Sequence, residues 1–101
     1  MLKVKGSTPT FTLKLPVHSD IITDIQVIFV QENIFSLTVE ADRITLDGYF
    51  ASFTLEDWET LEFAPGVIAD LQFSLTTDEG KIFVSDIKKV AVKKKYPEDI
   101  I

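Results

Sequence analysis

The sequence predicts an all-β protein, an antiparallel immunoglobulin-like β-sandwich of seven to eight short strands with one short helix near residues 55–61. Apolar and polar residues alternate without interruption from Ala69 to Thr76, which is the period of a half-buried strand. All four glycines lie in contexts typical of turns, such as Asp47-Gly48. β-branched and aromatic residues dominate the runs between these turns, as a pleated sheet surface favours.

The turns divide the chain into pieces of strand length. The expected strands cover residues 11–15, 25–30, 35–40, 43–46, 49–53, 67–76, 81–84 and 88–92. Residues 43–53 are expected to form a hairpin around Asp47-Gly48, a strong hairpin signal. In the strand 25–30, Ile25, Val27 and Phe29 share one face, while the other face carries Ile28 and Val30. We therefore expect this strand to be buried on both faces.

Residues 54–61 break the strand period and predict one or two helical turns. Leu55, Trp58 and Leu61 follow one another at intervals of three residues, which places them on one side of a helix. Thr54 is the expected N-cap, and the acidic residues after it suit the positive end of the helix dipole. Trp58 is accordingly expected to close one open end of the sandwich as a buried side chain.

The composition is that of an ordinary globular domain. The chain has 101 residues, 46% hydrophobic and 26% charged, so we expect a single domain over residues 1–101 with a flexible tail at 96–101. The absence of cysteine excludes disulfides and thiolate metal sites. We expect no signal peptide and no membrane-spanning segment, because the longest apolar run covers only residues 27–30.

Charge is unevenly distributed along the chain. The formal net charge is −6, which argues against nucleic-acid binding. Residues 1–15 and 81–101 each carry a net charge of +3, whereas residues 16–80 hold thirteen acids against Arg43 alone. Because oppositely charged faces favour oriented contacts, we expect the basic ends to meet the acidic middle of another copy or of another protein.

The sequence shows no catalytic or metal-binding motif. His18 is the single histidine and falls in an expected loop, no glycine-rich phosphate loop is present, and Asp78-Glu79-Gly80 is typical of a hairpin tip rather than a calcium loop. We therefore expect a non-enzymatic protein with no catalytic residue, no cofactor and no metal. A glycosidase with paired carboxylates is the remaining enzyme hypothesis, although a chain of this length offers little room for its cleft.

Two surface hypotheses remain. The lysines near the C-terminus form a candidate interface with protein, and edge-strand protection is the simpler interpretation; its members are Lys88, Lys89, Lys93, Lys94 and Lys95. Nucleic acid is a less favoured partner, because only one aromatic residue lies near these lysines. Alternatively, Trp58, Tyr49 and Phe50 are candidates for a sugar-stacking platform in a carbohydrate-binding or adhesion module.

The order of several segments resembles a known group of proteins. The segments are Thr8-Pro9-Thr10-Phe11-Thr12, residues 25–31, Asp47-Gly48, residues 54–63, residues 69–76 and Ser85-Asp86-Ile87-Lys88-Lys89-Val90. In this order the chain resembles small all-β proteins of prophage tail modules in Gram-positive bacteria, and it is more distantly similar to the N-terminal β-sandwich of phage baseplate upper proteins. The resemblance implies a structural component of a phage tail or baseplate, with itself or other tail proteins as partners. It also implies synthesis in the host bacterial cytoplasm before incorporation into the virion tail.

Overall fold

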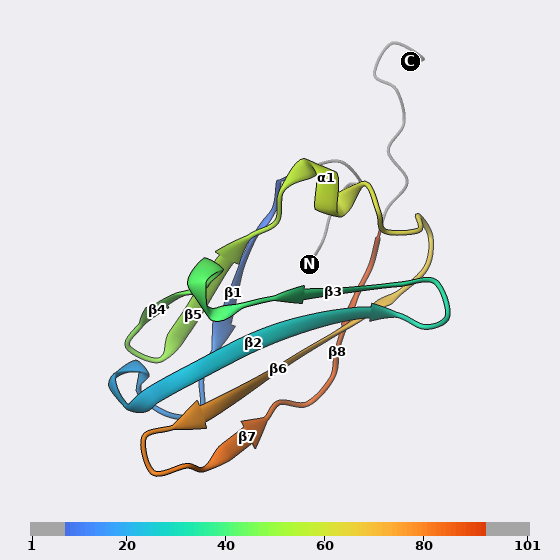
Figure 1. Ribbon diagram of the computed structural model, residues 1–101. Helices are drawn as coiled ribbons and strands as arrows, with labels where there is room; N and C mark the ends of the chain where they lie inside the picture. Colours follow the sequence, from blue (N-terminus) through green and yellow to red (C-terminus); the bar gives the residue numbers. More distant parts are fainter. Residues whose placement is uncertain (1–7, 93–101) are drawn as a thin grey trace.

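Eight antiparallel strands in two sheets, with one short α-helix, make up residues 8–92, the part of the chain that the computed structural model describes (Figure 1). The strands are β1 (Thr10–Lys14), β2 (Ile22–Gln31), β3 (Phe35–Val39), β4 (Thr45–Asp47), β5 (Phe50–Thr54), β6 (Ala69–Thr77), β7 (Ile82–Val84) and β8 (Lys88–Val90). The helical segments are α1 (Asp57–Thr60) and the 3₁₀ turns η1 (Ser19–Ile21) and η2 (Ala41–Arg43). The predicted all-β class and the short helix are confirmed; the tail expected at 96–101 lies outside the described residues.

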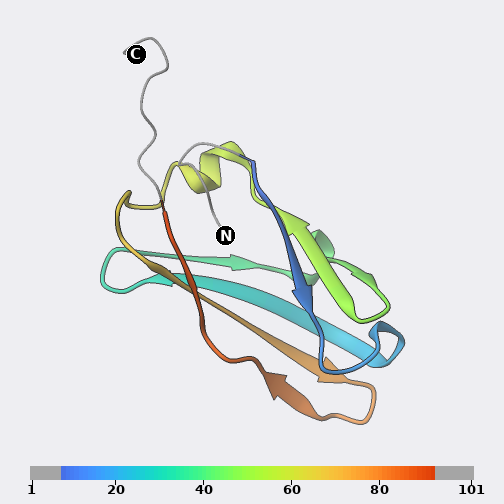
Figure 2. The same cartoon turned by 180° about the vertical axis from the view of Figure 1, so that it is seen from behind.

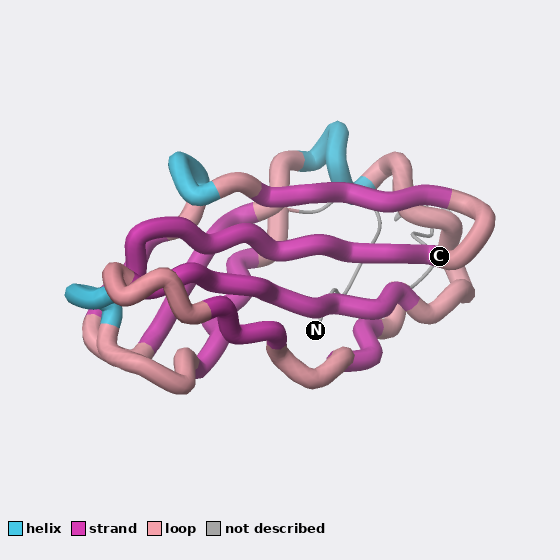
Figure 3. The backbone as a smooth tube through the Cα atoms, turned by 60° about the horizontal axis from the view of Figure 1, so that its bottom comes forward, coloured by secondary structure: helices cyan, strands magenta, loops and turns pink. Residues whose placement is uncertain are grey.

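The two sheets differ in size and share no strand. β1, β5 and β4 form a three-stranded sheet in that order, and β3, β2 and β6 form the main part of a five-stranded sheet. The last two strands lie along the same edge of β6, where β8 pairs with residues 69–71 and β7 with residues 74–76. Figure 3 shows the long strands of the larger sheet side by side, with the smaller sheet crossing behind them.

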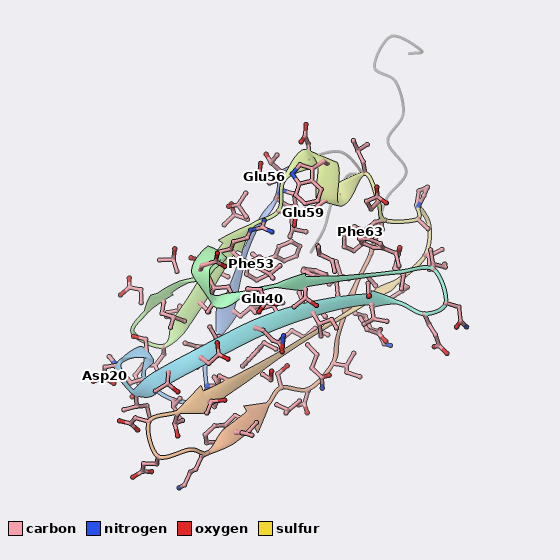
Figure 4. The ribbon with its side chains drawn as sticks, in the orientation of Figure 1. Asp20, Glu40, Phe53, Glu56, Glu59 and Phe63 are labelled. Atoms are coloured by element: carbon pink, nitrogen blue, oxygen red, sulfur yellow. The ribbon has the colours of Figure 1, made fainter. Side chains whose placement is uncertain are left out.

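Aromatic rings join the two sheets into one hydrophobic core. The ring of Phe11 on β1 lies 5.4 Å from that of Phe29 on β2 and 5.4 Å from that of Phe53 on β5, measured between ring centroids. Figure 4 shows Phe53 directed into the space between the sheets. Because a buried cluster contains residues of both sheets, the sandwich has a continuous core rather than two separate ones.

The predicted alternation of residues 69–76 is confirmed in detail. Ala69, Leu71, Phe73 and Leu75 on β6 are each at most 5% exposed, and the residues between them are partly exposed. The hairpin of β4 and β5 is also confirmed, and Gly48 in its turn adopts a φ of +60°, a left-handed conformation that glycine accepts without steric cost. Strand period therefore located the buried face of β6, and turn chemistry located the β4–β5 hairpin.

The expectation that residues 25–30 are buried on both faces is wrong. Ile25, Val27 and Phe29 on the inner face are at most 2% exposed, as expected. On the outer face Gln26 is exposed, and Ile28 and Val30 are only half-buried. The reason is that no element of the described chain covers the outer face of the larger sheet, so these side chains are shielded only by neighbours on the adjacent strands.

The helix is shorter than predicted and begins later. Its N-cap is Glu56, not Thr54, and Glu56 and Glu59 form a reciprocal capping box in which each side chain bonds the other's backbone N–H. Leu55 precedes the helix and is fully buried, whereas Trp58 is 61% exposed and Leu61 is 53% exposed. The spacing misled because Leu55 lies outside the helix, so a helical period does not set the direction of its side chain.

Phe63, rather than Trp58, closes this end of the sandwich. Its side chain is fully buried, and its ring centroid lies 5.6 Å from that of Phe29 and 5.1 Å from that of Phe35. Both contacts are edge-to-face, a favourable arrangement for aromatic rings. Figure 4 shows Phe63 below the ribbon that follows α1, inside the sandwich. The predicted aromatic closure is present, but a different residue provides it.

Replacing Trp58 with alanine is expected to change the free energy of unfolding by no more than about 1 kcal/mol, because most of this side chain is already in water. In the native protein, the tryptophan fluorescence maximum should lie close to that of free tryptophan in water. Urea denaturation and an emission spectrum check both points. A loss of several kcal/mol together with blue-shifted emission would contradict the exposed position of Trp58.

Candidate interaction surfaces

The described lysines of the predicted basic interface lie on β8, at an edge of the larger sheet. Lys88 and Lys89 are both exposed, but consecutive side chains on a strand point to opposite faces. Lys89 lies opposite Asp70 on β6, and its Nζ is 2.6 Å from Asp70 Oδ1. One of the two lysines is thus engaged in an ion pair within the chain. Lys93, Lys94 and Lys95 lie outside the described residues.

Lys88 borders a hollow on the open side of the sandwich. β1 and β8 lie in different sheets and do not pair with each other, and a hollow of about 450 Å³ lies between them. Its apolar lining comes from Phe11, Leu13, Leu71 and Val90. An adjoining hollow of about 480 Å³ extends towards Phe73 and Phe83. Figure 2 shows β1 and β8 as the strands that face each other on this side.

We call the two adjoining spaces together the basic hollow, because Lys14 and Lys88 line both of them; Lys89 also lines the first and Asp86 the second, so the lining is positive in sum. The remaining charges of the described chain are mostly acidic. An apolar floor with a positively charged rim suits an acidic protein surface or an acidic extended segment, since burial supplies affinity and charge supplies orientation. Lys14, which the prediction did not include, thus joins Lys88 in the candidate interface.

Pairs of large apolar side chains are exposed at three further places, and Ile34, Ile68 and Ile87 are exposed singly. Tyr49 and Phe50 at the β4–β5 turn are each 51% exposed, and Trp58 with Leu61 forms a second exposed pair at α1. The third pair is Ile82 and Val84 on β7, which are 71% and 62% exposed. Neighbouring apolar side chains exposed in this way are typical of protein contact surfaces more than of an inert surface.

The three aromatic residues predicted as a sugar platform are not brought together. Tyr49 and Phe50 lie at the start of β5, whereas Trp58 lies on α1, beyond the other end of that strand (Figure 1). A strand of this length separates its ends by about 13 Å, which is wider than one sugar ring. Tyr49 instead contacts His18, whose ring centroid lies 5.2 Å from its own in an edge-to-face arrangement.

An ion pair between the buried Glu59 and the partly exposed Arg43, which the sequence analysis missed, fixes α1 on the sandwich. Glu59 is 1% exposed, and its two carboxylate oxygens accept hydrogen bonds from Arg43 Nη1 at 2.5 Å and Nη2 at 2.6 Å. Glu59 also accepts from the Glu56 N–H at 2.8 Å, and Arg43 Nη2 donates to the Thr54 carbonyl at 3.1 Å. Figure 4 shows Glu59 on the inner side of α1. The pair connects η2, the end of β5 and α1.

The hydrogen bonds between these two side chains shift the pKa of both groups. The bonds from Arg43 hold the pKa of Glu59 below its ordinary value of about 4.5, although burial opposes this shift. The same bonds raise the pKa of Arg43 above its ordinary value, so its guanidinium stays charged. Both groups are therefore ionised at neutral pH. The pair acts as a structural clamp, because both carboxylate oxygens of Glu59 accept hydrogen bonds from groups within the fold.

The remaining titratable groups form no site of known chemistry in the described part of the chain. His18 is about half exposed, and its Nδ1 lies 2.8 Å from Asp20 Oδ1 at the start of η1. No group of three or more histidine, aspartate or glutamate residues within residues 8–92 is arranged to hold a metal ion. Asp78 and Glu79 lie in the exposed β6–β7 turn, as predicted for a hairpin tip. Within the same residues, no helix is sufficiently long and apolar to cross a lipid bilayer.

Three comparisons were made with known proteins, by family, by sequence and by fold. Neither the predicted tail-protein resemblance nor any other assignment gains support from them. No protein-family model, no curated protein and no solved structure matches this chain.

Proposed function

We propose that this chain is a non-enzymatic structural or assembly module of a phage or prophage tail or baseplate, acting through contacts with itself or with other tail proteins. The observation that carries the proposal is the basic hollow, where Lys14 and Lys88 border an apolar floor on an otherwise acidic domain. The exposed apolar pairs support the same interpretation, because they provide further contact surface.

The phage assignment rests on the order of sequence segments described above. A small β-sandwich with adhesive surfaces is compatible with a component that repeats around a tail axis. Under this proposal the chain is made in the host cytoplasm and then becomes part of the virion tail. It requires no cofactor, nucleic acid or membrane.

The immunoglobulin-like description also belongs to this proposal. Two packed antiparallel sheets around an aromatic core support it at the level of architecture. The strand order departs from the usual pattern, because β2 and β3 form a hairpin within one sheet, whereas the second and third strands of an immunoglobulin domain lie in opposite sheets. We therefore propose a relationship of architecture rather than of strand order.

Replacing Lys14 and Lys88 of the basic hollow should weaken binding to an acidic tail partner by about fivefold, the effect of losing two exposed ion pairs. The variant Lys14→Gln/Lys88→Gln lowers the net charge by two, and its matched control, Ser36→Glu/Thr38→Glu on β3, lowers it equally at the opposite edge of the larger sheet. Titration calorimetry with proteins encoded beside this chain measures both. Binding should also weaken from 0.1 to 1 M salt, as the Debye length shrinks from about 10 to about 3 Å.

Two results would contradict the proposal. One is a chain that binds none of the neighbouring tail proteins and shows no self-association at low salt. The other is equal weakening by both variants, which would mean that net charge rather than the basic hollow controls binding.

The exposure of Trp58 favours a second candidate, a carbohydrate-binding or adhesion module. Trp58 and its neighbour Leu61 offer a small apolar platform, without Tyr49 and Phe50. A glycan array tests this candidate, with Trp58→Ala as the informative variant because stacking on an indole ring should be lost without loss of stability. Absence of glycan binding in the native chain would remove it.

A further inference from the structure

β7 is an edge strand whose solvent-facing side chains are apolar. It pairs with β6 and with no other described strand, and it forms the lower border of the larger sheet in Figure 1. Ile82 and Val84 are 71% and 62% exposed, the highest values among the large apolar side chains of the described residues. Phe83 between them points to the inner face and packs against the core. The strand therefore presents an apolar face directly beside an open edge.

The backbone groups of the same two residues point away from β6. The Lys81 carbonyl accepts from the Thr77 N–H at 2.9 Å, and the Ser85 N–H donates to the Phe73 carbonyl at 2.9 Å. In an antiparallel ladder, successive residues direct their backbone groups alternately to one side and to the other. Residues 81, 83 and 85 therefore face β6, and Ile82 and Val84 each direct one N–H and one C=O to the open edge.

The other edge strands carry features that disfavour further pairing. β8 carries Lys88 and Lys89, β1 ends at Lys14, and β4, the outer strand of the smaller sheet, exposes Thr45 and Asp47. β3 exposes Ser36 and Thr38, so pairing there would cover no apolar side chain on the outer face. Charged or polar residues at an edge are the usual protection against pairing between molecules. In the described chain, β7 is the edge that combines free backbone groups with an exposed apolar face.

We propose that a second copy of this chain pairs with β7 through its own β7, in antiparallel orientation around a twofold axis at Phe83. Ile82 then lies opposite Val84 of the second copy, and each such pair exchanges two backbone hydrogen bonds. The twofold axis makes two of these pairs, and the larger sheets of the two copies become continuous. Ile82 and Val84 of each copy cover one another on the outer face.

The charges at the two ends of the strand favour the antiparallel orientation. Lys81 precedes β7 and Asp86 follows it, so antiparallel pairing brings the Lys81 end of one strand to the Asp86 end of the other, with Lys81 itself opposite Ser85. The Lys81 side chain is 70% exposed, and its contact with Glu79 is a distant one of 4.0 Å. A twofold contact repeats this match on both sides. The occupant that fits both the apolar and the charged positions is therefore a copy of β7 itself.

A contact built on three-residue strands is small, so the dimer is a weak one. It should not depend on low salt, because apolar burial and backbone bonds hold it while the net charge of −6 on each copy opposes it. This behaviour distinguishes the β7 contact from binding at the basic hollow, which salt weakens. The inference rests on the proposed assembly function in that it names one partner, a second copy.

Sedimentation velocity from about 10 µM to about 1 mM, in 0.1 and 1 M salt, measures the association. We expect a reversible dimer in the native chain, and a dissociation constant at least about tenfold higher for Val84→Lys, which places a charge on the edge. The matched control Thr38→Lys, an exposed outer-face position on the β3 edge, should dimerise like the native chain.

Amide hydrogen exchange provides a second measurement on the native protein. The amides of Ile82 and Val84 should become protected as the concentration rises, whereas the Phe83 amide, which faces β6, should be protected throughout. A monomer at every concentration, a dimer unaffected by Val84→Lys, or a dimer that leaves the Ile82 and Val84 amides unprotected would overturn the inference. A chain that forms no such dimer but binds tail proteins would refute β7 pairing alone. A chain that forms the dimer but binds no tail protein would refute the tail function alone.

Discussion

Phe63→Ala is expected to lower the free energy of unfolding by about 4 kcal/mol, the largest effect of any substitution considered for this chain. Its ring is fully buried and contacts Phe29 and Phe35 from two different strands. Truncation removes these contacts and leaves a cavity at the end of the sandwich, where the backbone of two strands limits collapse. Urea denaturation followed by circular dichroism measures the change.

The conservative variant Phe63→Leu provides the control. It keeps an apolar side chain at the end of the core and should recover a large part of the loss, since less volume is removed. A loss below about 1 kcal/mol for Phe63→Ala would contradict the view that this side chain closes the sandwich.

Glu59→Ala is expected to cost about 3 kcal/mol, because it leaves a charged guanidinium partly buried without its carboxylate and removes half of the capping box. The value lies at the lower end for broken buried pairs, since the Arg43 side chain is 33% exposed and can regain some hydration. Glu62→Gln, an exposed change in the same segment, is the control and should stay within about 0.5 kcal/mol of the native protein.

The same pair predicts how stability depends on pH. The pKa of Glu59 is lower in the folded chain than its ordinary value of about 4.5 in an unfolded chain. Its contribution is therefore complete above that value and is lost as the pH falls through the folded-state pKa. The difference in unfolding free energy between the native protein and Glu59→Gln should be constant near pH 7 and should shrink below pH 4.5. A difference that does not change in acid would contradict this role.

Much of the fold was predictable because strand period and turn residues are local signals. The alternation in β6 identified its buried face, and the Asp47-Gly48 pair identified the β4–β5 hairpin. The outer face of β2 was not predictable in the same way. Two apolar residues on that face indicate burial only if another layer covers it, and the strand itself carries no information about such a layer.

The errors at α1 have a related cause. A three-residue spacing assigns side chains to one face only when all of them belong to the helix, and Leu55 does not. Glu59 suits the third helical position of a capping box, but glutamate is not a preferred N-cap residue, so the local sequence favours Thr54 over Glu56 as the N-cap.

The candidate surfaces were only partly predictable. Arg43 is the single cation among residues 16–80, which suggests an acidic partner within the fold, but its contact with Glu59 requires the fold to place η2 within side-chain reach of α1. The consecutive positions of Lys88 and Lys89 on a strand already implied opposite directions. Neither the approach of Lys14 to Lys88 nor the exposure of β7 follows from local pattern, since both depend on which strands lie at the edges of the sheets.

The pairing of β2 with β6 has a consequence for how the chain folds. These two strands form the middle of the larger sheet, yet the whole of residues 32–68 lies between them in the sequence. The smaller sheet has the same property, because β1 reaches its partner β5 only after β2, β3 and β4 have been passed. The local hairpins therefore cannot bury the aromatic core by themselves, and the entropy of closing long loops must be overcome before that burial stabilises anything. Folding dominated by such distant pairings takes place in milliseconds to seconds, leaving the apolar β7 segment accessible to neighbouring chains while the sandwich is still incomplete.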